Sequence, residues 1–190
     1  MTQPTTVILI TGHPATGKTA LAHYLARELG LPLLHRDGLK ETLADTLGWS
    51  DDEWSLKLGA ATWELLYHLV EALLRARVSH IAESNFPPTR ATLRWQQLLE
   101  QYPLRIIQIR CEADPAIVAQ RHRARKEQGE RHPIHRYDAD MDAYAAYLQQ
   151  HGPLGWVEVA GERIALDTGQ KSTPEYPELA AQLHTMLKTI

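Results

Sequence analysis

The clearest chemical signature in the sequence lies in eight consecutive residues near the amino end. They fit the pattern GxxxxGK[ST]: Gly12, His13, Pro14, Ala15, Thr16, Gly17, Lys18 and Thr19. Glycines let the backbone curl so that its N–H groups converge on phosphate oxygens at the positive end of the following helix. Pro14 has no N–H, so the donors must come from its neighbours. We expect Lys18 to lie along the β- and γ-phosphates of a nucleotide and the Thr19 hydroxyl to bind Mg²⁺.

This phosphate loop, residues 12–19, stands between an apolar run and a helical pattern. Residues 7–10 are apolar and mostly β-branched, which is typical of a central strand covered on both faces. From Gly17 to Leu29 the leucines recur with helical spacing, and Gly30 is suited to end that helix. With this composition the pattern would arise by chance in only about two per thousand such chains.

Other nucleotide-binding classes lack their motifs in this sequence. It contains no GxG for a dinucleotide site and no NKxD for guanine recognition. Residues 45–48 fit DxxG, but they fall at the end of a helical stretch rather than after a strand. No apolar strand ends in Asp-Glu, as large mechanical ATPases require. The remaining class is a compact phosphoryl-transfer enzyme.

Two carboxylates follow predicted strands, at the sheet edge where α/β proteins bind ligands. Asp37 is a candidate to bind an acceptor hydroxyl or remove its proton, and the alternative is a cap of the next helix. Glu83 is a candidate to hold a Mg²⁺-bound water or the acceptor, and the alternative is a surface carboxylate. Asn85 and Phe86 are expected at the rim of the same crevice, where they would orient an acceptor.

The segment 121–136 is rich in arginine and carries a local charge of +4 in a chain whose net charge is −3. Arg121 and Arg125 share a helix face and are expected to point towards the nucleotide, whereas Arg123 points away. Arg131 lies in a loop that could fold over the site and contact the substrate. Such a lid would stabilise the transferred phosphoryl group and exclude water. The alternative is a solvated helix with Arg–Glu pairs.

The rest of the chain alternates predicted strands and helices, as a parallel sheet requires. Strands are expected at 31–35, 78–83 and 104–110, and helices at 39–47, 52–77, 88 onwards, 115 onwards, 137–150 and 175–187. The long helix is expected to bury one stripe: Trp54, Leu58, Ala61, Leu65, Leu69 and Leu73. Segments 157–159 and 163–166 flank Ala160-Gly161 and predict a hairpin that ends in a fifth core strand.

Composition sets the remaining expectations. The 190 residues show no linker or repeat, so we expect one domain over residues 1–190. A single cysteine, no apolar run long enough to cross a membrane and no secretory leader predict a cytoplasmic protein. Ten histidines show no zinc-binding spacing, and His132 and His135 have no assigned role. The negative charge outside the lid argues against nucleic acid as a partner.

Together, the phosphate loop, Asp37, the turn at residues 83–86, the arginine-rich segment and Asp167-Thr168 resemble a known family. It is the small P-loop kinases related to chloramphenicol phosphotransferase, gluconate kinase and shikimate kinase. The resemblance implies an α/β fold with three layers and a five-stranded parallel sheet in the order 2-3-1-4-5, covered by a mobile lid. It also implies ATP as donor, a small hydroxyl compound as acceptor, and acceptor binding at Asp37. Lid arginines would contact phosphate, and one of them would contact adenine.

The sequence therefore predicts an ATP-dependent phosphotransferase with a small alcohol as acceptor, in which Lys18, Asp37 and Arg125 carry the chemistry. Two alternatives stay open. A kinase of polynucleotide 5′-hydroxyl ends would need a basic track into the crevice. A nucleotide-binding sensor would bind ATP without forming a phosphorylated product.

Overall fold

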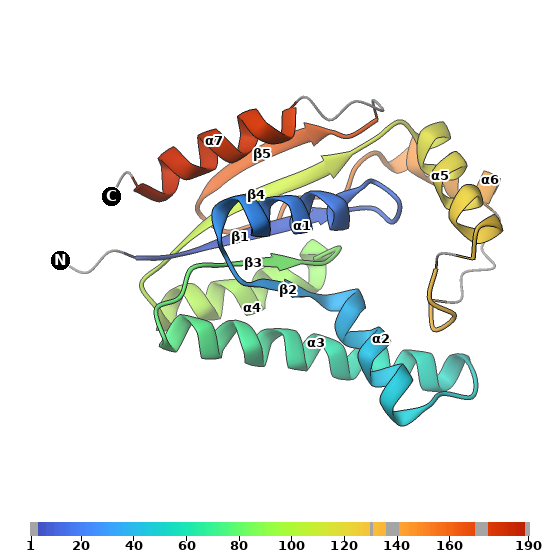
Figure 1. Cartoon of the computed structure of the whole chain (residues 1–190), viewed down its shortest axis with the longest axis horizontal. Coiled ribbons are helices and arrows are strands. Elements are labelled where there is room, and N and C mark those ends of the chain that lie inside the picture. Colours follow the sequence, from blue (N-terminus) through green and yellow to red (C-terminus); the bar gives the residue numbers. More distant parts are fainter. Residues whose placement is uncertain (1–3, 130, 136–140, 170–174, 189–190) are drawn as a thin grey trace.

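The computed structural model describes residues 4–129, 131–135, 141–169 and 175–188, and a parallel sheet lies at its centre (Figure 1). The strands are β1 (Thr5–Gly12), β2 (Leu33–His35), β3 (His80–Glu83), β4 (Leu104–Glu112) and β5 (Glu162–Asp167). They pair in the order β2-β3-β1-β4-β5, and every pair is parallel. The strand order implied by the resemblance to small P-loop kinases is confirmed.

Helices cover both faces of the sheet and give the fold three layers. They are α1 (Lys18–Leu29), α2 (Arg36–Leu47), α3 (Asp52–Arg75), α4 (Pro88–Gln101), α5 (Pro115–Glu127), α6 (Met141–His151) and α7 (Glu175–Lys188). Figure 1 shows α1 and α7 on one face and α3 and α4 on the other. Because side chains alternate along a strand, Ile8 and Ile10 pack towards α1 and α7, and Val7 and Leu9 pack towards α3 and α4.

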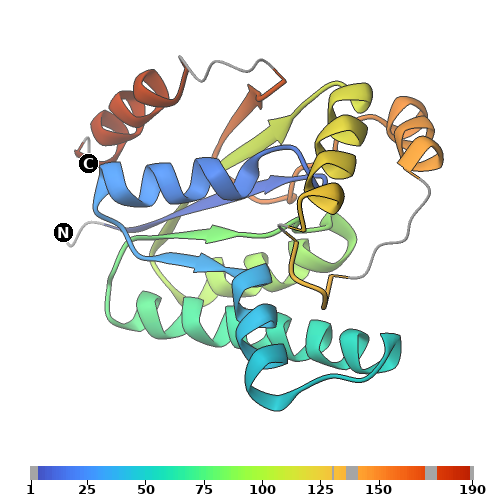
Figure 2. The ribbon, with the colours of Figure 1, turned by 45° about the vertical axis from the view of Figure 1, so that its right-hand side comes forward.

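The carboxyl ends of the strands meet at one edge, where the candidate site lies. Within the sheet, Ile10 pairs with Glu83, His35 pairs with Glu83, and Glu112 pairs with Asp167. Figure 2 shows α5 and α6 beyond this edge, with the chain after α5 running down towards α2. In the part of the chain that the structure describes, no helix is both long enough and apolar enough to span a membrane.

The apolar stripe predicted for α3 is confirmed at Leu58, but from Ala61 onwards the buried positions lie one residue later than predicted. Trp54 and Leu65 are exposed, and the buried positions are Leu58, Thr62, Leu66, Tyr67, Val70 and Leu74. The sequence pattern did not indicate this stripe, because the polar residue Thr62 occupies one of its buried positions. Its hydroxyl is satisfied within the helix by donating to the carbonyl of Gly59 at 2.9 Å.

The hairpin predicted around Ala160-Gly161 was also wrong, although the fifth strand after it is confirmed. The backbone of Val157 bonds to the buried side chain of Gln108, whose amide reaches both its C=O (3.0 Å) and its N–H (3.1 Å). The backbone of Val157 thus bonds to a side chain instead of to a neighbouring strand, so no hairpin forms here. Gly161 then passes so close to β4 that a Cβ would lie 2.2 Å from the carbonyl oxygen of Ile106. Of the helix predicted at 137–150, residues 137–140 lie outside the described residues.

Candidate functional site

The phosphate loop connects β1 to α1 and is curled by its own hydrogen bonds. The N–H and the hydroxyl of Thr16 both donate to the carbonyl of His13, at 3.3 and 2.8 Å. Gly12 has φ 148°, and a Cβ there would lie 2.6 Å from the carbonyl oxygen of Cys111, so only glycine fits. Gly17 has φ 82° and caps α1. The Thr16 N–H is thus already bonded, and the N–H groups at the start of α1 are the ones suited to bind an anion.

Lys18, Thr19 and Glu83 converge where β1 and β3 end. The Lys18 ammonium lies 3.8 Å from Oε1 of Glu83, and the Thr19 hydroxyl donates to Oε2 at 3.4 Å. Glu83 is only 2% exposed, and this burial raises the pKa of its carboxyl despite the charges of Lys18 and His35. Hydroxyl and carboxylate oxygens are the hard ligands that Mg²⁺ prefers. The structure therefore places Glu83 beside the phosphate loop rather than on an open surface.

His35 is a part of this site that the sequence reasoning missed. It is the last residue of β2, and its Nε2 lies 3.1 Å from Oε2 of Glu83. Gly38 leaves room for the ring, because a Cβ on Gly38 would lie 2.9 Å from Nδ1 of His35. The sequence signal that could have indicated this role is Gly38, which follows His35 by about one helical turn and leaves space for its ring.

Asp37 lies in the first turn of α2, which begins three residues earlier than predicted. The N-cap is His35, so Asp37 is not the cap considered from the sequence. Oδ1 of Asp37 lies 3.6 Å from Nη1 of Arg36. Burial acts to raise the pKa of Asp37, but the charges of His135, Lys18 and Arg36 outweigh it and hold that pKa below its ordinary value. Asp37 is therefore ionised at neutral pH and lies within the electrostatic reach of Lys18.

The two residues expected at the rim after Glu83 have different positions. The carbonyl of Asn85 accepts a hydrogen bond from the Thr11 hydroxyl at 2.8 Å, which ties this turn to β1. Phe86 was predicted at the rim, but it is fully buried and packs edge-on against Trp95 in the core. A chain that reverses with φ 34° at Phe86 points this ring inward.

The arginines of the lid divide into three environments. Arg121 donates to the carbonyl of Thr168, and its guanidinium lies near Gly17 of the phosphate loop. Arg125, one turn further along α5, is exposed. Arg131 donates to Nε2 of His122 at 2.8 Å. The structure thus brings Arg121 to the phosphate loop.

Residues 131–135, which we call the lid tip, dock on α2 and α3. His132 contacts Asp45 at 3.0 Å and His135 contacts Glu41 at 2.9 Å, one helical turn apart on α2. Between the two histidines, Ile134 is fully buried against Ala44 of α2 and Leu58 of α3. Leu43 of α2 and Trp49, in the segment between the two helices, pack at the edge of this cluster. His132 and His135, which had no role assigned from the sequence, therefore hold the lid tip to the helix that carries Asp37.

His13 ties the phosphate loop to the end of α6. Its Nε2 lies 3.2 Å from the carbonyl of Gly152, which can only accept, so Nε2 carries the proton. Nδ1 then accepts from the Tyr144 hydroxyl at 3.2 Å. Burial lowers the pKa of His13, and the Lys18 charge acts in the same direction, which keeps the ring neutral. No sequence pattern indicated this link between residues so far apart in the chain.

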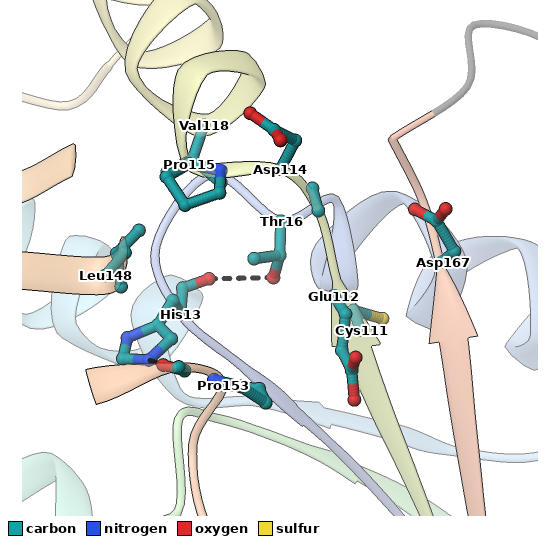
Figure 3. Close-up of a pocket in the computed structure, with 12 residues that line it drawn as sticks. His13, Thr16, Cys111, Glu112, Asp114, Pro115, Val118, Leu148, Pro153 and Asp167 are labelled. Carbon is teal, nitrogen blue, oxygen red and sulfur yellow. Dashed lines mark hydrogen bonds between the residues drawn. The ribbon is translucent and has the colours of Figure 1, made fainter. Parts of the chain in front are cut away.

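A cavity of about 370 Å³ borders the phosphate loop on the side of β4 and α6 (Figure 3). Its walls combine apolar residues such as Val118 and Leu148 with the carboxylates of Glu112, Asp114 and Asp167. Three carboxylates make this cavity unsuitable for a triphosphate. The phosphates of a nucleotide would therefore bind at the phosphate loop, beside Lys18, and not in this cavity.

The fold and the phosphate loop define the class, and comparison with known proteins supports it. The AAA_33 family model, described as an AAA domain, matches residues 7–154. The chain belongs to this family of P-loop kinase domains, so the resemblance to small P-loop kinases is confirmed.

Solved structures extend the comparison. A protein from Chloroflexus aurantiacus J-10-fl, described as a "putative kinase", is 37% identical, with a TM-score of 0.90 over 96% of this chain and 98% of that one. The adenosine 5′-phosphosulfate (APS) kinase CysC of Mycobacterium tuberculosis, in complex with AMPPNP and APS, is 16% identical, with a TM-score of 0.59 over 99% of this chain and 100% of that one. A gluconokinase from Sinorhizobium meliloti 1021 is 17% identical, with a TM-score of 0.52 over 98% and 97%. The last two show the fold alone. A search of curated proteins gave no match.

Proposed function

We propose that the protein is an ATP-dependent phosphotransferase that moves the γ-phosphoryl group of Mg·ATP to a hydroxyl group of a small molecule. The observation that carries this proposal is that the phosphate-binding residues and a candidate base lie at the same edge of the sheet. Lys18, Thr19 and Glu83 meet at the phosphate loop, and the ionised Asp37 stands within electrostatic reach of Lys18. A phosphate-binding group and a base at the same edge are what transfer to a hydroxyl requires.

The residues present fit Mg·ATP. Gly12 and Gly17 free the loop backbone to surround phosphates, and Lys18 would neutralise the β- and γ-oxygens. The Thr19 hydroxyl would bind Mg²⁺ directly, and Glu83 would hold one of its water ligands. ATP would supply the activated phosphoryl group, and Mg²⁺ would neutralise the charge that develops on it. Arg121 would lie beside the nucleotide because it already lies near Gly17.

Asp37 would orient the acceptor hydroxyl and receive its proton. In the transfer the hydroxyl oxygen bonds to the γ-phosphorus, the bond from that phosphorus to the β–γ bridging oxygen breaks, and the proton passes to a carboxylate oxygen of Asp37. The low pKa of Asp37 keeps this oxygen free of protons at neutral pH. The lid would complete the site, with Arg125 and Arg131 as the arginines proposed to stabilise the transferred group and to contact the acceptor.

A product assay tests this proposal. The protein is incubated with Mg·[γ-³²P]ATP and a panel of sugars, nucleosides and aminoglycoside-type alcohols, and labelled products are separated chromatographically. We expect transfer to at least one alcohol and none with Lys18→Ala. Binding of Mg·ATP without any labelled product would instead establish a sensor. Labelling of 5′-hydroxyl oligonucleotides alone would establish a polynucleotide kinase.

A further inference from the structure

Two cations of α2 converge on one glycine of α3. The guanidinium of Arg36 donates to the carbonyl of Gly59 at 3.0 Å and lies over the ring of Trp63, 4.5 Å from its centre. The ammonium of Lys40, one turn further along α2, donates to the Ser55 hydroxyl at 2.8 Å. A Cβ on Gly59 would lie 3.5 Å from Nη2 of Arg36 and 3.9 Å from Nζ of Lys40. The absence of a side chain at Gly59 therefore leaves space where both cations lie.

The lid tip, which docks on α2 through His132 and His135, carries a third cation, Arg131, whose charge acts on Lys40. Partial burial of Lys40 is the main cause that lowers the pKa of its ammonium, and the charges of Arg36 and Arg131 act in the same direction. Asp37 acts on Lys40 in the opposite direction but does not outweigh these contributions. A lowered lysine pKa means that the positive charge is disfavoured where it stands, so a nearby anion would lower the free energy.

Two carboxylates of α2 lie near these cations: Asp37 offsets part of their charge, and Glu41 is engaged by the lid tip. Asp37 lies 3.6 Å from Arg36 and is the base of the proposed reaction, and Glu41 is engaged by His135 at 2.9 Å. The cations thus lie beside the proposed base, within one turn of α2, and close to the lid tip. Like charges are held together at a cost in free energy, and that cost would be recovered when an oxyanion binds between them.

We propose that the acceptor carries an anionic oxygen group, either a carboxylate or a phosphate, which Arg36, Lys40 and Arg131 bind while the acceptor hydroxyl lies at Asp37. This inference rests on the proposed function and narrows its substrate class. Guanidinium groups suit it because they bind carboxylate and phosphate oxygens through two parallel hydrogen bonds. Arg131 comes from the lid tip, so an anionic acceptor would also hold the lid over the site.

Calorimetry on the protein saturated with Mg·AMPPNP tests this anion site, because the nucleotide then fills the phosphate loop. Inorganic sulfate and acetate are titrated separately as tetrahedral and carboxylate probes. The variant Lys40→Gln removes the charge and keeps a polar side chain that can reach Ser55. The control is Lys57→Gln, an exposed lysine on α3. We expect one of the two anions to bind with 1:1 stoichiometry, and at least tenfold more weakly to Lys40→Gln than to the control.

The nucleotide titration and the anion titration separate failure of the proposed function from failure of this inference. If Mg·AMPPNP does not bind, the proposed function is wrong and this inference is wrong with it. If the nucleotide binds but neither anion does, or if both variants bind the anion equally, only the anionic acceptor is refuted. As a second readout, acids are compared with their neutral parents, such as a sugar acid with its sugar. A lower KM for the acid that is lost in Lys40→Gln supports the proposal, and preference for the neutral compound overturns it.

Discussion

The ammonium of Lys18 lies 3.8 Å from the carboxylate of Glu83, which joins the first residue of α1 to the last residue of β3. Glu83 is held from the other side by His35 at the end of β2. Three neighbouring elements of the fold therefore fix one carboxylate against the phosphate loop. A nucleotide phosphate would give Lys18 a second partner, while His35 would keep Glu83 in place.

The shape of the phosphate loop depends on Gly12. We expect Gly12→Ala to abolish detectable Mg·AMPPNP binding in calorimetry, because its Cβ would clash with the Cys111 carbonyl. The matched control is Gly48→Ala, which also has positive φ (74°) but has no atom within 4 Å of the added Cβ among the described residues. It should lose only about 1–3 kcal/mol of stability from backbone strain and should still bind. Equal binding by the two variants would contradict this account of the loop.

Removing the charge of Asp37 should separate binding from transfer. We expect Asp37→Asn to bind Mg·AMPPNP normally and to lower kcat for transfer about 10²–10⁴-fold, the range for loss of a general base. Asp52→Asn, at an exposed position in the first turn of α3, serves as the control. Because the pKa of Asp37 is lowered, its loss of activity by protonation should begin only below the usual aspartate range. Unchanged transfer by Asp37→Asn would remove it from the mechanism.

Stability should fall with acid because of His80. Its Nδ1 donates to the carbonyl of Val78 at 2.9 Å, and its buried Nε2 has no hydrogen-bond partner among the described residues. Burial lowers the pKa of His80 in the folded state, so below about pH 6.5 the unfolded chain binds more protons. The free energy of unfolding should therefore decrease as the pH falls from 6.5 through the folded-state pKa, by up to about 1.4 kcal/mol per pH unit for this one group.

Denaturant titrations between pH 5 and 8 measure that slope. His13 and His135 also have lowered pKa values and contribute in the same direction. The variant His80→Asn cannot become charged, so its slope should be shallower than that of the natural chain. An identical slope in the two proteins would show that His80 does not titrate as this structure requires.

Ile134 should decide whether the lid tip stays docked. Truncation of a fully buried isoleucine costs roughly 2–5 kcal/mol, more than so short a segment is expected to recover from its remaining contacts. We expect Ile134→Ala to speed tryptic cleavage within the lid and to raise the KM for the acceptor, while Mg·AMPPNP affinity stays unchanged. Leu56→Ala, at a position 75% exposed on α3, should behave like the natural chain. If Ile134→Ala changed only the affinity for Mg·AMPPNP, the lid tip would act on the nucleotide and not on the acceptor, which would contradict this prediction.

Local patterns were enough to predict the framework of the site. The phosphate loop, the apolar strand before it and the carboxylate of Glu83 at a strand end are adjacent in sequence to the elements that position them. Their chemistry was therefore readable without tertiary contacts. The strand order came from the resemblance to known kinases and not from periodicity.

Contacts between distant segments were not predictable in this way. Phe86 follows a glutamate and an asparagine of the site, yet a positive φ turns its ring into the core. The burial of Ile134 requires α2, α3 and the lid tip to meet, and no spacing in the sequence encodes that meeting. The role of His35 likewise depends on the pairing of β2 with β3.

The central claim is that residues 12–19 bind the phosphates of Mg·ATP through backbone N–H groups and the ammonium of Lys18. Calorimetric titration of the protein with Mg·AMPPNP, repeated with Lys18→Ala, tests it most directly. The account predicts saturable 1:1 binding that Lys18→Ala weakens by at least an order of magnitude. Absence of binding to the natural chain, or equal affinity in both proteins, would contradict it.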